Sequence, residues 1–400
     1  MLGVHIVDYT MPLLGYQDFL LPKKMQDLGN STVILTSDRY TPISNYESSW
    51  EPIMGPRVCG KGDFYCDGLL IKRLEPVYEV QRRIKLRGLY TELVNLKPQY
   101  IFVHNILSMN IPSAIKYARK YEIPLFIDSH LTHTSTNKSF AGRIYYMIMR
   151  KYYQKNRKHV SGFYGVAEEC RDHMHQYLGI SRELSKLLPI GIDEKIFQFN
   201  LAHRKKKRRE LNVSDDQILL MQTGKLCSEK GVHLLTATIG MLSAEKRKRL
   251  KIVFVGDGDK DYLRQAVIEP FRAIGFDSYK ITGFVDYRVL PEYFSAADIV
   301  VYPKASSLSA LEAASCRNVV IMSDTDASKW RAKKGVGLSQ NFANALETSS
   351  VLNSFLEADS IELEKIKLLA AEAVHNEFSY ESVVKLLLND INFCRNESTS

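Results

Sequence analysis

The sequence contains few cysteines and no long apolar segment. Its six cysteines are scattered without the C-x-x-C spacing of zinc sites, which favours buried thiols in a reducing cytosol over a disulfide framework. No apolar run approaches the roughly 18–20 residues that a membrane-spanning helix requires. The first nine residues read as a strand and contain neither the basic nor the apolar region of a signal peptide. These absences predict a cytoplasmic protein.

Acidic residues are outnumbered, and the excess of positive charge predicts an anionic partner. The 54 lysines and arginines against 45 acidic residues give a net charge of +9. Nucleic acid, a phosphorylated ligand and an anionic membrane surface would each fit this charge. Because the sequence contains no recognisable DNA- or RNA-binding motif, we expect no nucleic-acid partner.

The order of apolar and amphipathic segments predicts an α/β fold. A chain of 400 residues is too long for one core and suits two domains. Short apolar runs separated by helical segments are typical of parallel strands that are covered on both faces. Such runs occupy residues 4–7, 32–35, 69–71, 100–103, 124–127 and 162–166 in the first half, and 218–221, 251–255, 279–282, 299–302 and 318–322 in the second.

The two halves meet near residue 190. Pro189 and Gly191 suit a hinge, and the basic run at 203–209 suits the solvated start of a helix. We therefore predict one domain at 1–188 and a second at 189–376. A C-terminal helix at 377–400 should cross back to the first domain and end in a disordered tail.

Residues 221–231, Met-Gln-Thr-Gly-Lys-Leu-Cys-Ser-Glu-Lys-Gly, predict a strand that ends in a glycine and a basic turn. Gly224 follows the apolar run, while Lys225 and Lys230 lie on the turn and the start of the next helix. Two ammonium groups and free backbone N–H donors at the carboxyl end of a parallel strand suit a diphosphate. A solvated basic turn is the alternative.

Two later strands also end in glycine. Gly256-Asp-Gly258 follows the first of them, and glycines allow a backbone to approach a ligand closely, although Gly-x-Gly alone is a weak signal. Gly283 follows the second and precedes Phe284 and Val285. This aromatic and aliphatic pair could hold a nucleobase, and core packing of Phe284 is the alternative.

Small and hydroxyl-bearing residues precede a helix that we expect to begin near Leu308. The N–H groups and the dipole of a helix start favour a phosphate. Glu312 falls one turn into this helix, where a carboxylate would suit the two hydroxyls of a ribose. A surface glutamate is the alternative.

The order and spacing of these segments resemble the donor half of a family 4 glycosyltransferase of the GT-B fold, among the glycosyl transferases group 1. The resemblance extends over roughly residues 187–325. The first half resembles the family more loosely, through Gly15, His104 and Asp128-Ser-His130. The matching segments are Leu188–Asp193, Gly224-Lys225, Glu229–Gly231, Val255–Gly258, Gly283–Val285, Leu290–Asp298 and Ser309–Ala313.

The resemblance implies a GT-B architecture, in which two Rossmann-like domains have parallel sheets that face a central cleft. It implies that Lys225 and Lys230 hold the donor diphosphate and stabilise the departing charge, and that His130 lies near the reacting sugar. A structural role is the alternative for His130. The resemblance further implies retention of configuration and no metal or other cofactor. The donor-binding residues would be Gly15, Gly224, Gly256, Phe284, Val285, Leu308, Ser309 and Glu312.

The chain departs from the family at two positions. Lys304 occupies the place of the first acid of the E-x7-E pair, so the contact of that acid with the donor sugar is in doubt. Lys225 stands where arginine is common, which keeps the charge but loses the bidentate fork.

The resemblance therefore implies a hexosyltransferase that uses a nucleotide sugar, UDP-linked rather than GDP-linked, and a glycan or glycolipid acceptor in surface polysaccharide synthesis. One alternative is a catalytically silent GT-B subunit that binds a partner transferase, which Lys304 favours. The other is a nucleotide-sugar epimerase, which would need acid/base pairs that the sequence does not place.

The segment 138–158 predicts a peripheral membrane contact. It contains basic residues from Lys138 to Lys158 and no acid, with tyrosines, methionines and an isoleucine between them. Such a segment suits an anionic inner leaflet and the capture of a lipid-linked acceptor. A helix with a solvated basic face is the alternative.

Overall fold

The computed structural model describes residues 1–43, 46–133, 135–137, 139–304 and 307–399. The chain forms two compact units. Unit 1 comprises Met1–Gly191 and Tyr380–Ser400, and unit 2 comprises Ile192–Ser379. The sequence placed these boundaries at 188/189 and 376/377. The chain therefore leaves unit 1 once and returns to it with the helix α18 (Tyr380–Thr399).

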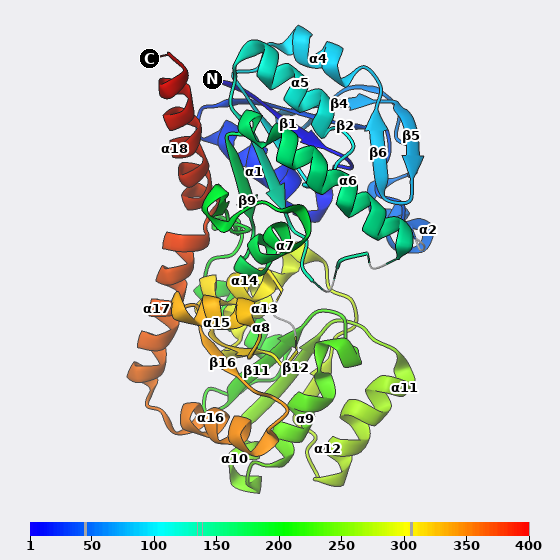
Figure 1. Ribbon diagram of the computed structural model, residues 1–400. Helices are drawn as coiled ribbons and strands as arrows, with labels where there is room; N and C mark the ends of the chain where they lie inside the picture. The colour runs from blue at the N-terminus through cyan, green and yellow to red at the C-terminus, as the bar shows by residue number, and fades with distance from the viewer. Residues whose placement is uncertain (44–45, 134, 138, 305–306, 400) are drawn as a thin grey trace. The chain divides into compact units, whose positions relative to one another are not determined.

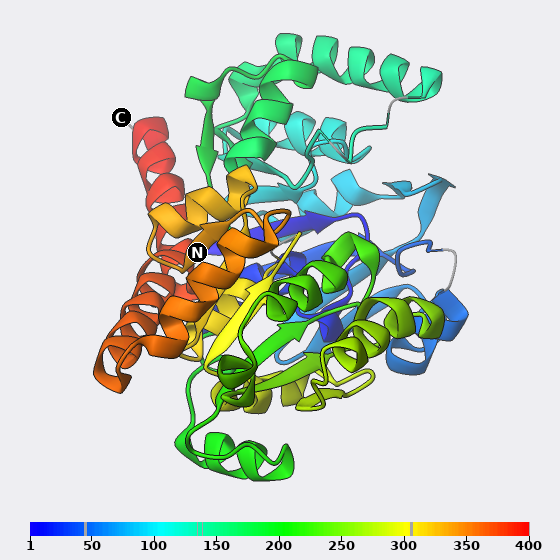
Figure 2. The ribbon, with the colours of Figure 1, turned by 90° about the horizontal axis from the view of Figure 1, so that it is seen from below.

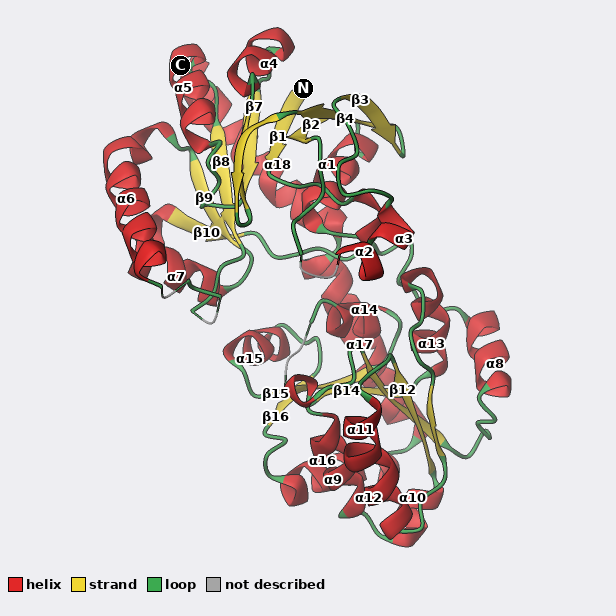
Figure 3. Ribbon diagram, turned by 90° about the vertical axis from the view of Figure 1, so that its right-hand side faces the viewer, coloured by secondary structure: helices red, strands yellow, loops and turns green. Residues whose placement is uncertain are grey.

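Unit 1 is built on an eight-stranded sheet with the order β10-β9-β8-β7-β1-β2-β4-β3 (Figure 3). Neighbouring strands are parallel except for the antiparallel pair β3 and β4. β5 and β6 form a separate antiparallel hairpin. The strands are β1 (Leu2–Val7), β2 (Ser31–Ser37), β3 (Gly62–Cys66), β4 (Leu69–Leu74), β5 (Pro76–Val80), β6 (Arg83–Leu86), β7 (Tyr100–His104), β8 (Leu125–Ser129), β9 (Gly162–Gly165) and β10 (Ser185–Leu187).

Helices cover both faces of this sheet because the buried strand residues alternate in direction. Ile101 and Val103 pack beneath α4, α5, α6 and α7, whereas Tyr100 and Phe102 pack on the opposite face beneath α1 and α18. α1 and α18 lie side by side there (Figure 1). The helices of unit 1 that precede α18 are α1 (Gln17–Asp27), α2 (Tyr46–Ser49), α3 (Glu51–Met54), α4 (Leu89–Leu96), α5 (Ile111–Tyr121), α6 (Phe140–Asn156) and α7 (Glu168–Leu178).

Unit 2 contains a fully parallel sheet with the order β13-β12-β11-β14-β15-β16. This is the strand order of a doubly wound α/β sheet, in which the chain runs outward in both directions from a central pair. The predicted α/β class with parallel sheets is thus confirmed. The strands are β11 (Ile218–Thr223), β12 (Leu250–Val255), β13 (Tyr279–Ile281), β14 (Ile299–Tyr302), β15 (Val319–Ser323) and β16 (Leu338–Gln340).

The sheet of unit 2 is also covered on both faces. Met221 and Val300 pack towards α13, α14 and α17, while Leu220 and Ile299 pack towards α9, α12 and α16. Among the described residues, no helix is both long enough and apolar enough to cross a membrane. The helices of unit 2 are α8 (Leu201–Glu210), α9 (Val232–Gly240), α10 (Ala244–Lys248), α11 (Lys260–Leu263), α12 (Glu269–Ala273), α13 (Leu290–Ala296), α14 (Ser309–Ser315), α15 (Asp326–Lys333), α16 (Ala345–Glu357) and α17 (Ser360–Phe378).

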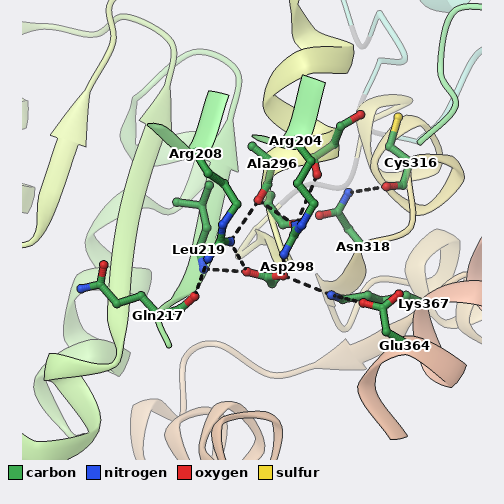
Figure 4. Close-up of polar contacts among 12 residues, drawn as sticks. Arg204, Arg208, Gln217, Leu219, Ala296, Asp298, Cys316, Asn318, Glu364 and Lys367 are labelled. Carbon is green, nitrogen blue, oxygen red and sulfur yellow. Dashed lines mark hydrogen bonds and ion pairs between the residues drawn. The ribbon is translucent and has the colours of Figure 1, made fainter. Parts of the chain in front are cut away.

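The basic helix α8 is anchored to a buried carboxylate, Asp298, at the start of β14 (Figure 4). Asp298 Oδ1 lies 2.7 Å from an Arg204 nitrogen and 3.1 Å from Lys367 Nζ. Its Oδ2 lies 2.9 Å from an Arg208 nitrogen and accepts from Leu219 N at 2.9 Å. The expectation that the run 203–209 is solvated is therefore wrong for Arg208, which is buried and spaced one helical turn from Arg204.

Candidate functional site

The carboxyl edge of the unit 2 sheet provides the first candidate site. β11 and β14 are the central pair from which the chain winds in opposite directions, and ligands of doubly wound sheets bind at this switch point. The lysine turn, residues 224–231, follows β11. The loop 303–308 follows β14, although residues 305 and 306 lie outside the described part of the chain.

Three glycines allow the loops of this edge to pack closely. Gly224 has a φ of +113° and Gly256 a φ of +150°, and a Cβ on Gly256 would lie 1.9 Å from the Gly224 carbonyl oxygen. A Cβ on Gly258 would lie 2.1 Å from the Leu226 carbonyl oxygen. The Gly-x-Gly pair thus brings the loop after β12 against the lysine turn. The close packing of these loops explains why glycine is needed at Gly256 and Gly258. A contact of Gly224 or Gly256 with the donor remains a prediction.

The lysine turn is fixed by the loop beside it and by its own strand. Leu226 N donates to the Asp257 carbonyl at 2.8 Å, and the Gln222 side chain donates to the Lys230 carbonyl at 3.1 Å. Lys225 is exposed and Lys230 is half-buried. Both predicted lysines therefore belong to one short turn whose backbone is held at two points.

Lys304 joins the lysine turn from the β14 side. Its Nζ donates to the Ser228 carbonyl at 2.9 Å, and its own carbonyl accepts from Ser323 Oγ at 2.9 Å. A Cβ on Gly231 would lie 3.0 Å from Lys304 Cγ, so the two segments touch. In the sequence, Lys304 stands where the resembling family has an acid. In the structure, Lys304 contacts the turn that carries Lys225 and Lys230.

Helix α14 begins at Ser309, one residue after the predicted start, with Leu308 preceding it as its N-cap. The hydroxyl oxygens of Ser307 and Ser309 lie 2.6 Å apart at this end. Phosphate contacts by the Leu308 and Ser309 amides remain predictions.

Glu312 lies in the first turn of α14 and is buried, with 3% of its surface exposed. Burial raises the pKa of its carboxyl to about 7, and the Tyr287 hydroxyl, which donates to Oε1 at 2.9 Å, opposes that rise. The alternative of a surface glutamate is wrong. Tyr287 belongs to the short helix Tyr287–Val289 and was missed because the contact joins residues 25 positions apart.

Phe284 and Val285, the predicted base-binding pair, lie in different environments. Phe284 is 78% exposed, so the alternative of core packing is wrong for it. Val285 instead packs against the core beneath α13 and α14. Phe284 is therefore the member of the pair that is free to stack on a ligand.

Arg331 on α15 is a further cation near this edge that the sequence did not single out. One of its nitrogens donates to the Ser307 carbonyl at 2.9 Å, and burial lowers its pKa to about 10. No local motif marks Arg331, because it reaches the loop from the helix that follows β15.

Unit 1 contains the other predicted residues, Gly15 and His130. Gly15 has a φ of +68° and ends the short helix Pro12–Leu14 between β1 and α1. His130 follows β8, its side chain is 43% exposed, and its Nε2 lies 3.5 Å from Asp128 Oδ2.

Within the described ranges, no group of three or more His, Cys, Asp or Glu side chains could hold a metal ion.

Comparison with known proteins relates part of the second half of the chain to a known family. Residues 217–348 match the family model described as "Glycosyl transferases group 1". These residues contain the lysine turn, Lys304 and Glu312. The match therefore covers the part of unit 2 that forms the candidate site.

Two relatives illustrate the relationship. TuaC of Bacillus subtilis (strain 168), which carries the name "Putative teichuronic acid biosynthesis glycosyltransferase", is 33% identical over 144 residues, which are 35% of this chain and 33% of TuaC. The lipopolysaccharide 1,2-N-acetylglucosaminetransferase of Salmonella typhimurium is 25% identical over 194 residues, 44% of this chain and 49% of that enzyme. The alignments thus span a third to a half of these relatives.

Solved structures match the whole chain in fold. Anabaena Alr3699/HepE in complex with UDP has a TM-score of 0.70 and 14% identity, over 98% of this chain and 100% of HepE. The sucrose-phosphate synthase of Thermosynechococcus elongatus has a TM-score of 0.66 and 14% identity, over 100% of both chains. The fold is that of the GT-B glycosyltransferases, as predicted.

Proposed function

We propose that this protein is a glycosyltransferase that moves a hexose-type sugar from a nucleoside-diphosphate donor to a glycan or glycolipid acceptor, with retention. The observation that carries the proposal is the carboxyl edge of the unit 2 sheet. There the lysine turn and Lys304 touch, and the buried Glu312 follows on the next helix, all inside the segment matched by the family. Cations at a switch point suit a diphosphate, and a buried carboxylate suits the hydroxyls of a ribose.

The proposed mechanism relies on fixed charge. Lys225 and Lys230 bind the diphosphate and stabilise the negative charge that grows on it as the bond to the sugar breaks. Glu312 binds the ribose, Phe284 stacks on the base, and we expect His130 and Gly15 to contact the donor. Because the lysines already supply positive charge, we expect full activity in excess EDTA.

The donor and acceptor classes are proposed by analogy. The HepE structures contain UDP or UDP-glucose, which supports UDP over GDP as the base-bearing group. The names of TuaC and the Salmonella enzyme refer to teichuronic acid and lipopolysaccharide, which supports a role in surface polysaccharide synthesis.

Helix α6 supports a membrane-bound acceptor. It lies at the periphery of unit 1 (Figure 2) and buries Tyr146, Met149 and Tyr153 against the core. Lys138, the first residue of the predicted patch, lies outside the described residues. The α6 surface, which we propose rests on an anionic leaflet at the cytoplasmic face, combines exposed Phe140, Ile144, Met147 and Ile148 with exposed Arg143, Arg150, Lys151 and Lys155.

A catalytically silent subunit is the second candidate, because Lys304 replaces an acid and is bonded to the Ser228 carbonyl. A panel of UDP- and GDP-sugars, assayed by thermal shift and by donor hydrolysis with and without EDTA, separates the two. We expect a UDP-sugar to raise the Tm and to be hydrolysed slowly without acceptor. A raised Tm with no release of UDP under any condition would favour the silent subunit. Conversion of the donor to its epimer without UDP release would indicate an epimerase.

Stereochemistry needs its own measurement once an acceptor is found. The proton NMR spectrum of the product should show an axial linkage from an axial donor. An equatorial linkage would contradict retention.

A further inference from the structure

Unit 1 has its own switch point, and a group of titratable side chains gathers there. β1 lies between β2 and β7, so the chain winds outward in one direction through β2 and in the other through β7. His104 is the last residue of β7, Asp128 lies near the end of β8, and His130 follows β8. Asp18 lies in the first turn of α1, which follows β1.

Asp128 is fully buried and is held from three sides. Its Oδ1 accepts from the Asn105 backbone N–H at 2.8 Å. Its Oδ2 lies 3.0 Å from His104 Nδ1 and 3.5 Å from His130 Nε2. Burial alone would raise the pKa of Asp128, but His104 and His130 outweigh it and hold this pKa far below the usual range. Asp128 is therefore an ionised carboxylate inside the fold.

A chain of hydrogen bonds lies behind Asp128. His104 Nδ1 lies 3.0 Å from Asp128 Oδ2, and His104 Nε2 lies 3.0 Å from His5 Nδ1. His5 Nε2 lies 3.4 Å from the Tyr100 hydroxyl. Burial, reinforced by His104, holds the pKa of His5 well below its usual value, so His5 stays neutral. This chain connects the buried Tyr100 hydroxyl to Asp128.

His130 lies on the exposed side of Asp128 and, with His104, lowers the pKa of that carboxyl. Burial disfavours the charged ring, but Asp128 and then Asp18 outweigh it, and the pKa of His130 is raised. Asp18 is a second carboxyl that acts on His130. Burial raises the pKa of Asp18 to about 6, and the nearby His104 and His130 oppose this rise. His130 thus faces two carboxylates from the protein while 43% of its side chain remains exposed.

We propose that Asp128 is a positioning residue that, fixed by His104 and the Asn105 amide, orients His130 and keeps its ring cationic. The exposed part of the ring then presents a positive charge at the switch point of unit 1, where it can pair with an anionic group of a substrate. This inference rests on the proposed function and sharpens it. A neutral His130 would only exchange hydrogen bonds with a sugar hydroxyl, whereas a cation also attracts a phosphate.

NMR titration of the ten histidines in the full-length chain tests the arrangement without any assay of activity. The His130 signal is assigned from its loss in His130→Gln. We expect its pKa in the wild type to lie above about 6.5, the value of an unperturbed histidine. In Asp128→Asn it should fall by about one unit or more, a ten-fold change in the protonation equilibrium. His133→Gln, a neighbouring histidine outside the hydrogen-bond chain, should leave it unchanged.

A wild-type His130 pKa at or below about 6.5 would overturn the proposal, as would an unchanged value in folded Asp128→Asn. If Asp128→Asn does not fold, the wild-type titration decides. His104→Gln, which retains a side-chain N–H donor, should preserve most of the effect.

Kinetics separate this inference from the proposed function. In an active enzyme, Asp128→Asn should lower kcat more than it raises the donor KM, and should move the alkaline limb of the kcat profile to lower pH. If NMR shows the shift but the wild type turns over no donor, the transferase function fails and the Asp128–His130 pair stands. If the enzyme is active and its pH profile is unchanged in Asp128→Asn, the pair has no role in turnover.

Discussion

At the scale of single residues, the burial of Glu312 makes the stability of the fold dependent on pH. Its folded pKa of about 7 lies above that of an unfolded glutamate, so the folded state loses stability as the pH rises through about 7. We expect Glu312→Gln to flatten this dependence and to weaken nucleoside diphosphate binding at pH 8 by about 1–3 kcal/mol. Calorimetry and thermal melts at pH 6 and pH 8 measure both effects.

Two companion variants sharpen the Glu312 test. Tyr287→Phe removes a hydrogen bond that favours the ionised carboxylate, so it should raise the pKa of Glu312 further. Glu372→Gln, on the exposed surface of α17, should change neither affinity nor the pH dependence of stability. If Glu312→Gln and the wild type bind the nucleoside diphosphate with the same affinity, Glu312 does not contact the ribose.

The lysine turn gives the second prediction at this scale. Lys225→Ala and Lys230→Ala should each lower transfer by about 100-fold, as for the loss of one preorganised charge donor. Urea denaturation should show little change in stability, because Lys225 is exposed and Lys230 is half-buried on a turn held by backbone bonds. Lys248→Ala, an exposed lysine of α10, is the matched control. Near-normal transfer in both single variants would exclude the diphosphate role.

The sequence predicted the residues of this edge that follow a strand in the chain, and it missed those that arrive from elsewhere. Gly224 and Lys225 could be found because a glycine after an apolar run marks the carboxyl end of a strand, and Glu312 because small and hydroxyl-bearing residues precede its helix. Arg331 and the His5–His104 pair could not, since their contacts depend on strand order. The two histidines lie 99 positions apart in the sequence and meet only because β1 pairs with β7.

At the scale of elements, Asp298 joins helix α8 and helix α17 to the sheet. Asp298→Asn leaves three buried or half-buried cations without their partner, so we expect a loss of about 3–5 kcal/mol in the free energy of unfolding. Burial raises the pKa of Asp298, but Lys367, Arg204 and Arg208 outweigh it and hold it at about 2. The contribution is therefore present above about pH 4 and is lost as the pH falls towards 2.

Urea denaturation at pH 7 and pH 3 measures this contribution. The difference between Asp298→Asn and the wild type should shrink at the lower pH. Glu357→Gln removes an exposed ion pair with Lys246 and should change stability little. Equal stability of Asp298→Asn and the wild type at pH 7 would contradict the role of Asp298 as an anchor.

The α6 surface gives a second prediction at this scale. The protein should bind anionic vesicles reversibly, and salt should weaken binding because the attraction is screened over about 8–10 Å at moderate ionic strength. Replacing Lys151 and Lys155 with Ser should weaken flotation with the vesicles, at about 1 kcal/mol per basic residue. Lys205→Ser with Arg209→Ser, on exposed positions of α8, is the control. If the wild-type protein does not bind anionic vesicles at low salt, α6 is a helix with a solvated basic face and not a membrane contact.

At the scale of the whole molecule, unit 2 is one continuous stretch of chain with two apolar cores of its own. A fragment of residues 192–379 should therefore fold cooperatively and bind the nucleoside diphosphate, but it should transfer no sugar. Chemical denaturation and calorimetry test the two statements. A fragment that folds without binding would show that the nucleotide needs residues of unit 1.

The fold class was predictable because buried parallel strands read as apolar runs, whereas the strand order was not. The strands β3, β5, β6, β10 and β16 were missed, since at most two residues of each are buried. The hairpin β5–β6 and the antiparallel β3 therefore appear only in the structure.

The return of α18 to unit 1 has a consequence for biosynthesis. Val383, Leu387 and Ile391 of α18 pack in the same core as Tyr100 and Phe102. The part of unit 1 that is synthesised first therefore cannot bury this face of its sheet until α18 has been synthesised. Residues 192–379 separate the two parts, which at about 5–20 residues per second corresponds to roughly 10–40 s on the ribosome. Unit 2, although encoded later, can reach its native state first. The nascent N-terminal half must meanwhile remain exposed to chaperones, so translation speed and chaperone supply should limit the yield of this protein.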